Sequence, residues 1–301
     1  MKREKISIII TAWKEPSTVW QLVLDLEAQI QDRVEQFEIL LLCPDEQTAN
    51  SGIGADSLGI LRWIKDEGRG KPVALNIAFS EVQGNILILT DGDVKVAQNA
   101  IGRLIGGFTS SRVGAVTGHS IPINSRKTMF GYWAHLLTEA GAHRKRLRQQ
   151  QEGKFIICSG YLMAIRFGIF DKIPENSLVD DAVISHKIWN AGFGIVYAPN
   201  ALVYVKFPTN FGDWLRQKKR SAGGYIQLPG LVTVKKDNMR SFLKEVWGIW
   251  DALSYLRSLR ELRWTFLLVL ARLYLWLLIF WEQKIMKKSF EKTWARVEST
   301  K

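Results

Sequence analysis

The sequence has few cysteines and lacks the clustered ligands of a zinc site. Only two cysteines, Cys43 and Cys158, occur among the 301 residues, and each lies in an apolar run, ILLLC and FIICSG. The chain has no C-x-x-C pair and no cysteine–histidine spacing typical of zinc ligands. We therefore expect two buried, reduced thiols, as in a cytosolic protein, and no zinc domain.

The chain also lacks internal repeats, low-complexity tracts and an excess of acid. Its 47% hydrophobic and 23% charged residues exclude a disordered composition and provide a core for one large domain or two small ones. The apolar run of the N-terminal MKREKISIIIT is too short for a secretory signal, so we expect it to lead directly into a domain. The net charge of +12 suits an anionic partner: nucleic acid, a phosphorylated substrate or a membrane surface.

Short apolar runs alternate with stretches of helical spacing in the first hundred residues. The expected elements are strands at 6–11, 37–43, 62–67 and 85–90 and helices at 17–30 and 73–82, with a glycine-rich stretch after Asp45 and a GRGKP loop. This order predicts an α/β fold with a mostly parallel sheet flanked by helices. Ligands of such sheets bind beyond the carboxyl ends of the strands, where Thr11, Asp45 and Asp91 fall.

The second half of the chain continues with mixed elements before its composition changes near residue 240. The expected elements are helices at 97–108, 125–150, 180–192 and 211–224, strands at 114–120 and 155–166, and a strand at 194–207 that is broken by a Pro-Asn turn. Residues 241–263 are amphipathic and basic, and residues 264–281 are almost entirely apolar. We therefore predict a catalytic domain at 1–235 and a membrane-associated helical region at 236–301.

Two acids follow the buried strand NILILT. Asp91 and Asp93 flank a glycine, and an Asp-Gly turn at the surface is the ordinary interpretation of such a sequence. Two carboxylates on one loop also suit Mg²⁺, which takes one or two carboxylates together with phosphate oxygens. The bound ion would neutralise charge on a leaving diphosphate.

Two later clusters have the same double interpretation. Asp180 and Asp181 open a predicted helix, where acids suit the macrodipole, but adjacent acids in a site can also give one carboxyl the raised pKa of a general base. The basic run QKKR at 217–220 is either a solvated face or a phosphate-binding group.

The ordered set of motifs resembles the family 2 glycosyltransferases with the GT-A fold. The matching segments, within about residues 5–225, are the opening IIITAWKEPSTV, GKPVALN for the family's GKxxALN, DGD for its DxD, SLVDD with Asp180 in place of the usual Glu, and QKKRS for QxxRW. The resemblance is strongest to the membrane-associated branch of cellulose, chitin and hyaluronan synthases. It implies inverting, metal-dependent transfer of a sugar, with a UDP-sugar as the favoured donor, to a hydroxyl of a lipid-linked or glycan acceptor.

The resemblance also implies a role for each matching residue. Asp181, with its neighbour Asp180, would be catalytic, and Asp93 and Asp91 would bind Mg²⁺ or Mn²⁺. The residues implied to contact the donor are Thr11, Ala12, Glu15, Asp45, Lys71 and Asp91, and Gln217 and Arg220 would hold the diphosphate or the acceptor region. Ser221 replaces the Trp of QxxRW, which favours transfer of one or a few sugars over the alternative, a processive polysaccharide synthase.

The apolar segment 264–281 predicts association with a membrane. Its 18 residues extend about 27 Å as a helix, close to the ~30 Å of a bilayer core. Arg272 lies near its centre and basic residues flank both ends, so the segment either spans the bilayer or lies in the interface with 241–263. We expect a membrane-associated protein with a cytoplasmic catalytic domain.

Two other classes of protein fit parts of the sequence. The charge of +12 and the run HRKRLR suggest a nucleic-acid-binding protein, but the basic residues are dispersed and no aromatic-basic recognition motif is present. A non-catalytic membrane partner is the other, and the retained Asp91, Asp93 and Asp181 argue against it. We expect no nucleic-acid partner.

Overall fold

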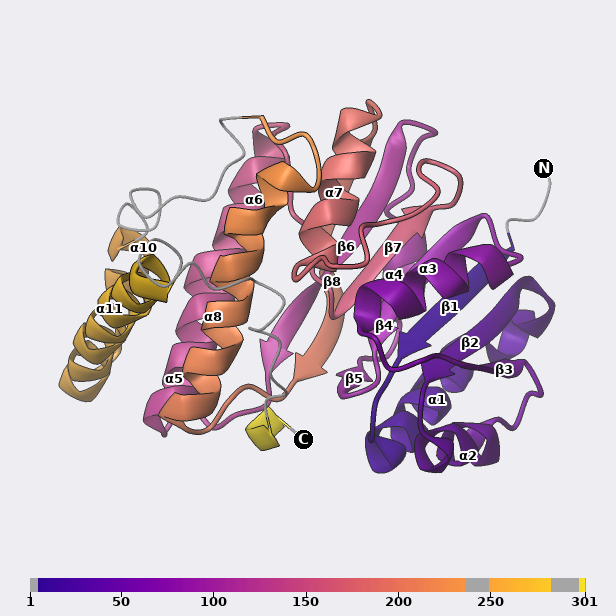
Figure 1. Ribbon diagram of the computed structural model, residues 1–301, viewed down its shortest axis with the longest axis horizontal. Coiled ribbons are helices and arrows are strands. Elements are labelled where there is room, and N and C mark those ends of the chain that lie inside the picture. The colour runs from indigo at the N-terminus through magenta and orange to yellow at the C-terminus, as the bar shows by residue number, and fades with distance from the viewer. Residues whose placement is uncertain (1–4, 236–248, 283–297, 301) are drawn as a thin grey trace. The chain divides into compact units, whose positions relative to one another are not determined.

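The computed structural model describes residues 5–235, 249–282 and 298–300 (Figure 1). Part of the predicted amphipathic segment, 241–248, lies outside these residues. The chain forms two compact units: Met1–Ser120, Gln149–Glu175 and Asp180–Val205 make the first, and Ile121–Arg148, Asn176–Val179 and Lys206–Lys301 the second. The predicted domain boundary at residue 235 stays a prediction.

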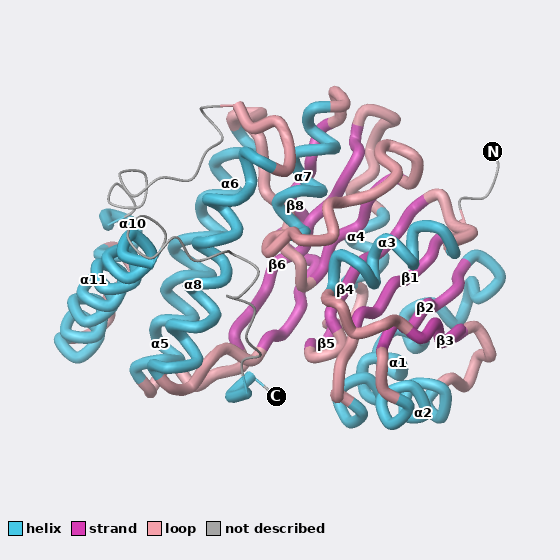
Figure 2. The backbone as a smooth tube through the Cα atoms, in the orientation of Figure 1, coloured by secondary structure: helices cyan, strands magenta, loops and turns pink. Residues whose placement is uncertain are grey.

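The first unit is built on one mixed sheet of eight strands in the order β3-β2-β1-β4-β7-β6-β8-β5 (Figure 2). The strands are β1 (Ile6–Thr11), β2 (Phe37–Cys43), β3 (Leu61–Lys65), β4 (Ile86–Asp91), β5 (Val94–Val96), β6 (Val113–Pro122), β7 (Leu162–Arg166) and β8 (Gly194–Val205). β3, β2, β1 and β4 pair in parallel, whereas β7 pairs antiparallel to both β4 and β6. The predicted parallel arrangement therefore holds for the N-terminal strands, and the remainder makes the sheet mixed.

Hydrophobic burial on both faces explains the N-terminal strands. All six residues of β1 are buried, and its neighbours are the almost fully buried β2 and β4. The helices of this unit are α1 (Pro16–Ile30), α2 (Glu46–Ala55), α3 (Lys71–Glu81), α4 (Ala100–Ile105) and α7 (Asp180–Asn190). α3 packs on β1 and β2 and lies in front of the sheet in Figure 1. Helix-forming connections between parallel strands thus supply the second layer of the core.

The glycine-rich stretch after Asp45, for which the sequence predicted neither helix nor strand, is the helix α2. Asp45 caps this helix by accepting the backbone N–H of Thr48. A Cβ at Gly52 would lie 2.5 Å from Leu41 Cδ2, so this glycine lets α2 pack closely on β2. Tertiary packing therefore outweighs the low helix propensity of glycine here.

Two predicted strands also differ from the structure. Only the second half of 155–166 is strand, because Cys158 and Ser159 donate their N–H groups to the side chains of Ser185 and Thr117 instead of to a neighbouring strand. β8 is continuous from Gly194 to Val205, and no turn breaks it at Pro199. Its buried positions keep a period of two on both sides of this proline, so one face stays inward throughout.

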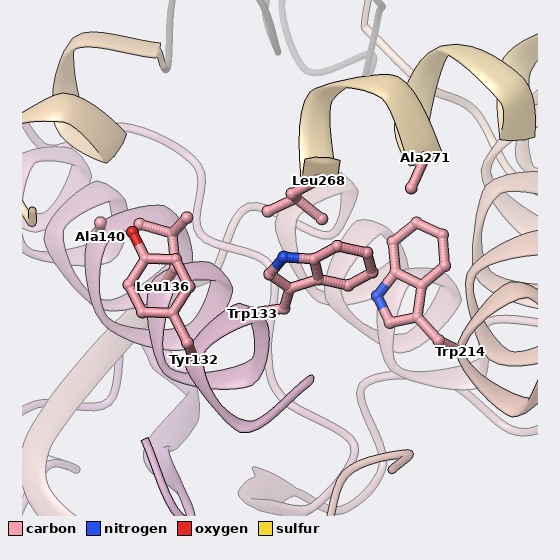
Figure 3. Packing of buried hydrophobic residues seen from close by; sticks show 7 residues of the cluster. All are labelled: Tyr132, Trp133, Leu136, Ala140, Trp214, Leu268 and Ala271. Carbon is pink, nitrogen blue, oxygen red and sulfur yellow. The ribbon is translucent and has the colours of Figure 1, made fainter. Parts of the chain in front are cut away.

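The second unit is a helical assembly with an aromatic core. Its helices are α5 (Met129–His135), α8 (Phe211–Gln227), α10 (Ile249–Leu253) and α11 (Leu259–Phe280), and α6 (Arg144–Gln151) continues α5 through the π-helical segment Leu136–His143. Figure 3 shows Trp133 of α5 and Trp214 of α8 facing Leu268 and Ala271 of α11. The two indole rings meet edge to face, with centroids 5.2 Å apart. This core joins α5, α8 and α11 into one body.

Candidate active site

The two acids of the DGD sequence lie at the carboxyl end of β4. Asp91 is the last residue of the strand, and Asp93 is half-buried in the turn to β5. Gly92 between them donates its N–H to the carbonyl of Thr11, and a Cβ there would lie 2.5 Å from Ala12 Cβ and 2.8 Å from Glu15 Oε2. The glycine is needed because the turn presses against the loop after β1, and this contact brings the two aspartates beside Thr11, Ala12 and Glu15.

Lys71 connects Asp91, at the end of β4, with the acids of α7. Its Nζ donates to Asp91 Oδ1 at 2.6 Å and to the carbonyl of Gly160 at 3.1 Å, and it lies 3.4 Å from Asp180 Oδ2. Burial lowers the pKa of Lys71, but the charges of Asp180, Asp91 and Asp181 outweigh it and raise that pKa above its usual value. The ammonium therefore stays charged and partly balances three carboxylates.

The N-terminus of α7 presents the second acid pair to this lysine. Asp181 accepts the N–H of Ala182 at 2.8 Å and that of Gly160 at 3.3 Å. Burial, and then the charge of Asp180, raises the pKa of Asp181 from 3.8 to about 6, against the lowering effect of Lys71. A carboxyl with this pKa is ionised at neutral pH and still accepts a proton, as a general base must.

Asp45 shapes the loop between β1 and α1. Its Oδ2 accepts the N–H of Lys14 at 2.8 Å, and its Oδ1 accepts that of Thr48 at 3.0 Å. Lys14 has a left-handed backbone with φ of 56°, which is uncommon outside glycine. Burial raises the pKa of Asp45, but these hydrogen bonds outweigh it and hold the pKa below its ordinary value. Its predicted contact with the nucleotide base or ribose stays a prediction.

Sequence reasoning missed two neighbours of the site, Asp66 and Gly160. Asp66 follows β3 as Asp45 follows β2, and it is buried, so that desolvation and the charge of Asp45 raise its pKa despite a hydrogen bond from Gly68. The prediction of strand through residue 67 concealed this position. Gly160 contacts both Lys71 and Asp181 through its backbone, a role that leaves no side-chain signal in a sequence.

Gln217 and Arg220 lie on α8, in the second unit. Both side chains are half-buried, and Gln217 Oε1 accepts no hydrogen bond from the described residues. Lys219 of the same basic run pairs with Glu282. The run is therefore partly engaged within its own unit, and the phosphate-binding role of Gln217 and Arg220 stays a prediction.

The acids of β4 fit a hard divalent cation that shares its ligands with a phosphate group. Within the described residues, no group of three or more His, Cys, Asp or Glu side chains would hold a metal ion. Mg²⁺ usually takes only one or two carboxylates and completes its shell with water and substrate phosphates. Asp180 Oδ2 is buried and accepts no hydrogen bond from a described residue, and its ion-pair partner is the ammonium of Lys71 at 3.4 Å.

Comparison with known proteins identifies the family of this chain. A family profile described as "Glycosyltransferase like family 2" matches residues 3–224, which are most of the chain and include the acids around Lys71. The chain belongs to glycosyltransferase-like family 2. Its fold matches GT-A glycosyltransferases of known structure. One of them is the mannosyltransferase PcManGT of Pyrobaculum calidifontis in complex with GDP-Man and Mn²⁺. The match to PcManGT has a TM-score of 0.60 and 16% identity, and it covers 97% of this chain and 86% of PcManGT. TarS (residues 1–349) of S. aureus matches with a TM-score of 0.54, 15% identity and coverage of 86% and 77%.

Curated relatives match part of this chain at low identity. A probable glycosyltransferase, YdaM of Bacillus subtilis, is 24% identical over 231 residues, which cover 73% of this chain and 55% of the relative. An N-acetylglucosaminyltransferase of Azorhizobium caulinodans is 21% identical over 189 residues, which cover 59% of this chain and 48% of the relative. The chain thus spans about half the length of the curated relatives it matches.

Proposed function

We propose that this protein transfers a sugar from a nucleotide-diphosphate sugar to an acceptor hydroxyl, with Asp181 as the general base. The observation that supports it most is the convergence of Asp91, Asp180 and Asp181 on Lys71. This arrangement puts a carboxyl with a pKa of about 6 in the same cluster as an acid of the predicted cation site. The family membership of residues 3–224 supports the same reaction.

The reaction needs a base on one side of the sugar and charge neutralisation on the other. The acceptor oxygen would form a bond to the anomeric carbon while the bond to the diphosphate oxygen breaks, and the electron pair would leave with the diphosphate. Asp181 would take the hydroxyl proton, because a neutral hydroxyl is a poor nucleophile. Attack opposite the leaving group gives inversion, as the family resemblance implies.

Mg²⁺ or Mn²⁺ would be held by Asp93 and Asp91. When bound, the ion would supply positive charge to the leaving diphosphate. Lys71 already pairs with Asp91, so its ammonium would lie near the same phosphates and add to their stabilisation. Thr11, whose hydroxyl donates to Asp91 at 3.4 Å, would help to orient that carboxylate.

We favour a UDP-sugar as donor and a lipid-linked or glycan hydroxyl as acceptor. Ser221 stands where the synthase-like branch of the family has a tryptophan, which supports transfer of one or a few sugars. The named proteins differ in their sugars: one curated relative is an N-acetylglucosaminyltransferase, and one structural neighbour is a mannosyltransferase bound to GDP-Man. Purified protein should therefore be assayed for nucleoside-diphosphate release against a panel of UDP- and GDP-sugars, with Mn²⁺, Mg²⁺ or a chelator. Absence of binding and turnover with every donor and cation would exclude the proposal.

We also propose that the protein associates with a membrane and that its catalytic domain is cytoplasmic. α11 is long and apolar enough to cross a bilayer, with a mean hydropathy of 1.7 over its 18-residue window, of which 28% is buried. A lipid-linked acceptor would make this location useful. Fractionation of cells that express the full chain and a variant lacking residues 241–301 tests it, because only the full chain should sediment with membranes.

Asp181→Asn should stop transfer while leaving donor binding intact. An amide cannot take the hydroxyl proton, and loss of a general base costs typically 10²–10⁴-fold in rate, roughly. We expect kcat to fall by at least about 10²-fold and the donor Kd, measured by calorimetry with Mn²⁺, to change less than about threefold. Loss of donor binding together with transfer would show that Asp181 has a different role.

The same substitution should stabilise the fold at neutral pH, which separates lost catalysis from misfolding. The pKa of Asp181 is raised in the folded protein from 3.8 to about 6, so its charge destabilises the native state above pH 6 and costs nothing below pH 4. After allowance for partial exposure, Asp181→Asn should gain on the order of 2 kcal/mol. Thermal unfolding from pH 4 to 7.5 should show the two proteins diverging as pH rises.

A further inference from the structure

Helix α11 has two apolar faces, and the residues that the structure describes cover only one of them. The buried stripe repeats at helical spacing: Glu261, Thr265, Leu268, Ala271, Leu275 and Ile279. The opposite stripe is exposed and contains Leu259, Leu262, Phe266, Leu270, Leu273, Leu277 and Phe280. Leu277 and Phe266 are 68% and 62% exposed. An uninterrupted row of large apolar side chains of this length marks an interaction surface.

Specific contacts fix the buried stripe along the whole helix. Near its N-terminus, Arg126 donates to both carboxylate oxygens of Glu261, at 2.8 and 3.0 Å. Three residues after Glu261, the carbonyl of Trp264 accepts from Trp133 Nε1 at 2.7 Å, next to the aromatic core of Figure 3, and Leu268 and Ala271 pack in that core further along the helix. Beyond its C-terminus, Glu282 pairs with Lys219 of α8. α11 is therefore held lengthwise by its own unit.

This attachment is incompatible with a helix that crosses the bilayer alone. If α11 stood perpendicular to a membrane, α5 and α8 would enter the hydrocarbon with it, because both pack on its inner stripe. α8 carries Arg216, whose side chain is half-exposed, and the half-buried Lys218 and Arg220. Charged side chains at that depth are costly, and they face protein or water when they occur.

We propose that α11 lies in the plane of the membrane, with its outer stripe in the boundary between headgroups and acyl chains of an anionic leaflet. An interfacial helix has a polar or protein-covered face opposite an apolar one, which α11 has. Arg257, Arg260 and Arg263 are exposed at its N-terminal end, where anionic headgroups would attract them. This inference deepens the proposed membrane association and is independent of sugar transfer.

The charge of the chain favours lipid over a second copy of the protein on this stripe. With a net charge of +12, two copies repel each other, whereas an anionic leaflet attracts each of them. In a dimer through α11, the exposed arginines of one copy would lie near the positive charges of the other copy. A dimer through α11 is therefore the alternative that the experiment must detect.

Vesicle flotation with Leu270→Glu/Leu277→Glu tests the surface. Unaltered protein should float with vesicles of phosphatidylcholine and phosphatidylglycerol, and the double variant should lose on the order of 100-fold in partition coefficient, because two leucines no longer enter the lipid. Ile53→Glu is the matched control, since Ile53 is an exposed apolar residue of α2 and should leave flotation unchanged. Equal flotation of all three proteins, or self-association through α11 without vesicle binding, would overturn the proposal.

Depth measurement decides between an in-plane and a spanning helix. Both native cysteines are buried, so spin labels can be attached to Phe266→Cys, Leu270→Cys and Leu277→Cys in the full chain. In-plane placement predicts similar, shallow depths at all three sites from oxygen and nickel accessibility. A spanning helix predicts a label at residue 270 that is much deeper than the others, which would overturn the proposal. Circular dichroism of each labelled protein checks that it is folded.

Discussion

The carboxylate cluster around Lys71 and the outer stripe of α11 depart from the usual distribution of side chains in opposite directions. The cluster withdraws three acids and a lysine from water at the edge of the sheet, with side-chain exposures of 22% for Lys71 and 16% for Asp180. The stripe leaves large apolar groups in contact with water. Folded proteins rarely bury charges or expose continuous apolar surface without a reason.

The difference agrees with the two kinds of partner that we propose. Buried charge that is only partly balanced suits a charged, polar ligand with its own cation, whereas an exposed apolar stripe suits lipid. Substitutions that affect one feature and spare the other test this distinction.

The largest expected effect is that of Asp93→Asn on the acid cluster. Loss of one carboxylate from the proposed cation site should lower kcat/KM by about 10³-fold, because several kcal/mol of charge stabilisation on the diphosphate depend on the ion. A transfer assay over a Mn²⁺ titration measures it. Asp32→Asn, at an exposed acid, is the control and should behave as the unaltered protein. An unchanged Mn²⁺ dependence in Asp93→Asn would remove this residue from the cation site.

Lys71→Met should reduce activity by about 10- to 100-fold and change its pH dependence. Lys71 lowers the pKa of Asp181, which is about 6, so its removal should raise that pKa. Because only the carboxylate form takes a proton, the acidic limb of kcat should move to higher pH. Lys65→Met, at an exposed lysine, should leave the limb in place. If the two variants share one pH profile, Lys71 does not control the base.

Gly92→Ala should destabilise the turn between the two aspartates by about 1–3 kcal/mol. The added Cβ would lie 2.5 Å from Ala12 Cβ, so the DGD turn or the loop after β1 must shift. Gly102→Ala is the matched control, since a Cβ within α4 has no atom within 4 Å there and should be neutral or slightly stabilising. Urea unfolding of both variants gives the comparison, and equal stabilities would mean that the turn tolerates a side chain.

The sequence was sufficient to predict the ends of β1 and β2, and the end of β4 to within one residue, and therefore much of the site. Thr11 and Asp91 pair in register on β1 and β4, as expected of two parallel buried strands. Helical spacing likewise predicted that a helix starts at Asp180, as α7 does. The ends of strands and helices are set by residues that are neighbours in the chain, so a sequence shows them directly.

Features that depend on contacts between distant segments were not predictable. Lys71 was placed in a loop, but it opens α3, and its link to Asp180 depends on the position of α7, which packs on β8. Gly160 lies in the site because two backbone N–H groups fix its loop: that of Ser159 donates to Thr117 on β6, and that of Gly160 donates to Asp181 on α7. The covered face of α11 likewise depends on residues more than a hundred positions away, such as Arg126.

The smallest expected effect concerns the hydrogen bond that holds the covered face of α11. Tyr132 is fully buried, and its hydroxyl lies 2.7 Å from Thr265 Oγ1, which also donates to the carbonyl of Glu261. Thr265→Val leaves the Tyr132 hydroxyl buried without this partner and should cost about 1–2 kcal/mol, whereas Tyr132→Phe, which leaves Thr265 its second partner, should cost about 1 kcal/mol. The double variant should cost less than the sum, because neither polar group remains without its partner. Urea unfolding of the four proteins measures this coupling, and vesicle flotation should be unchanged in all of them, because the outer stripe is intact. Additive costs would show that the two hydroxyls do not stabilise each other.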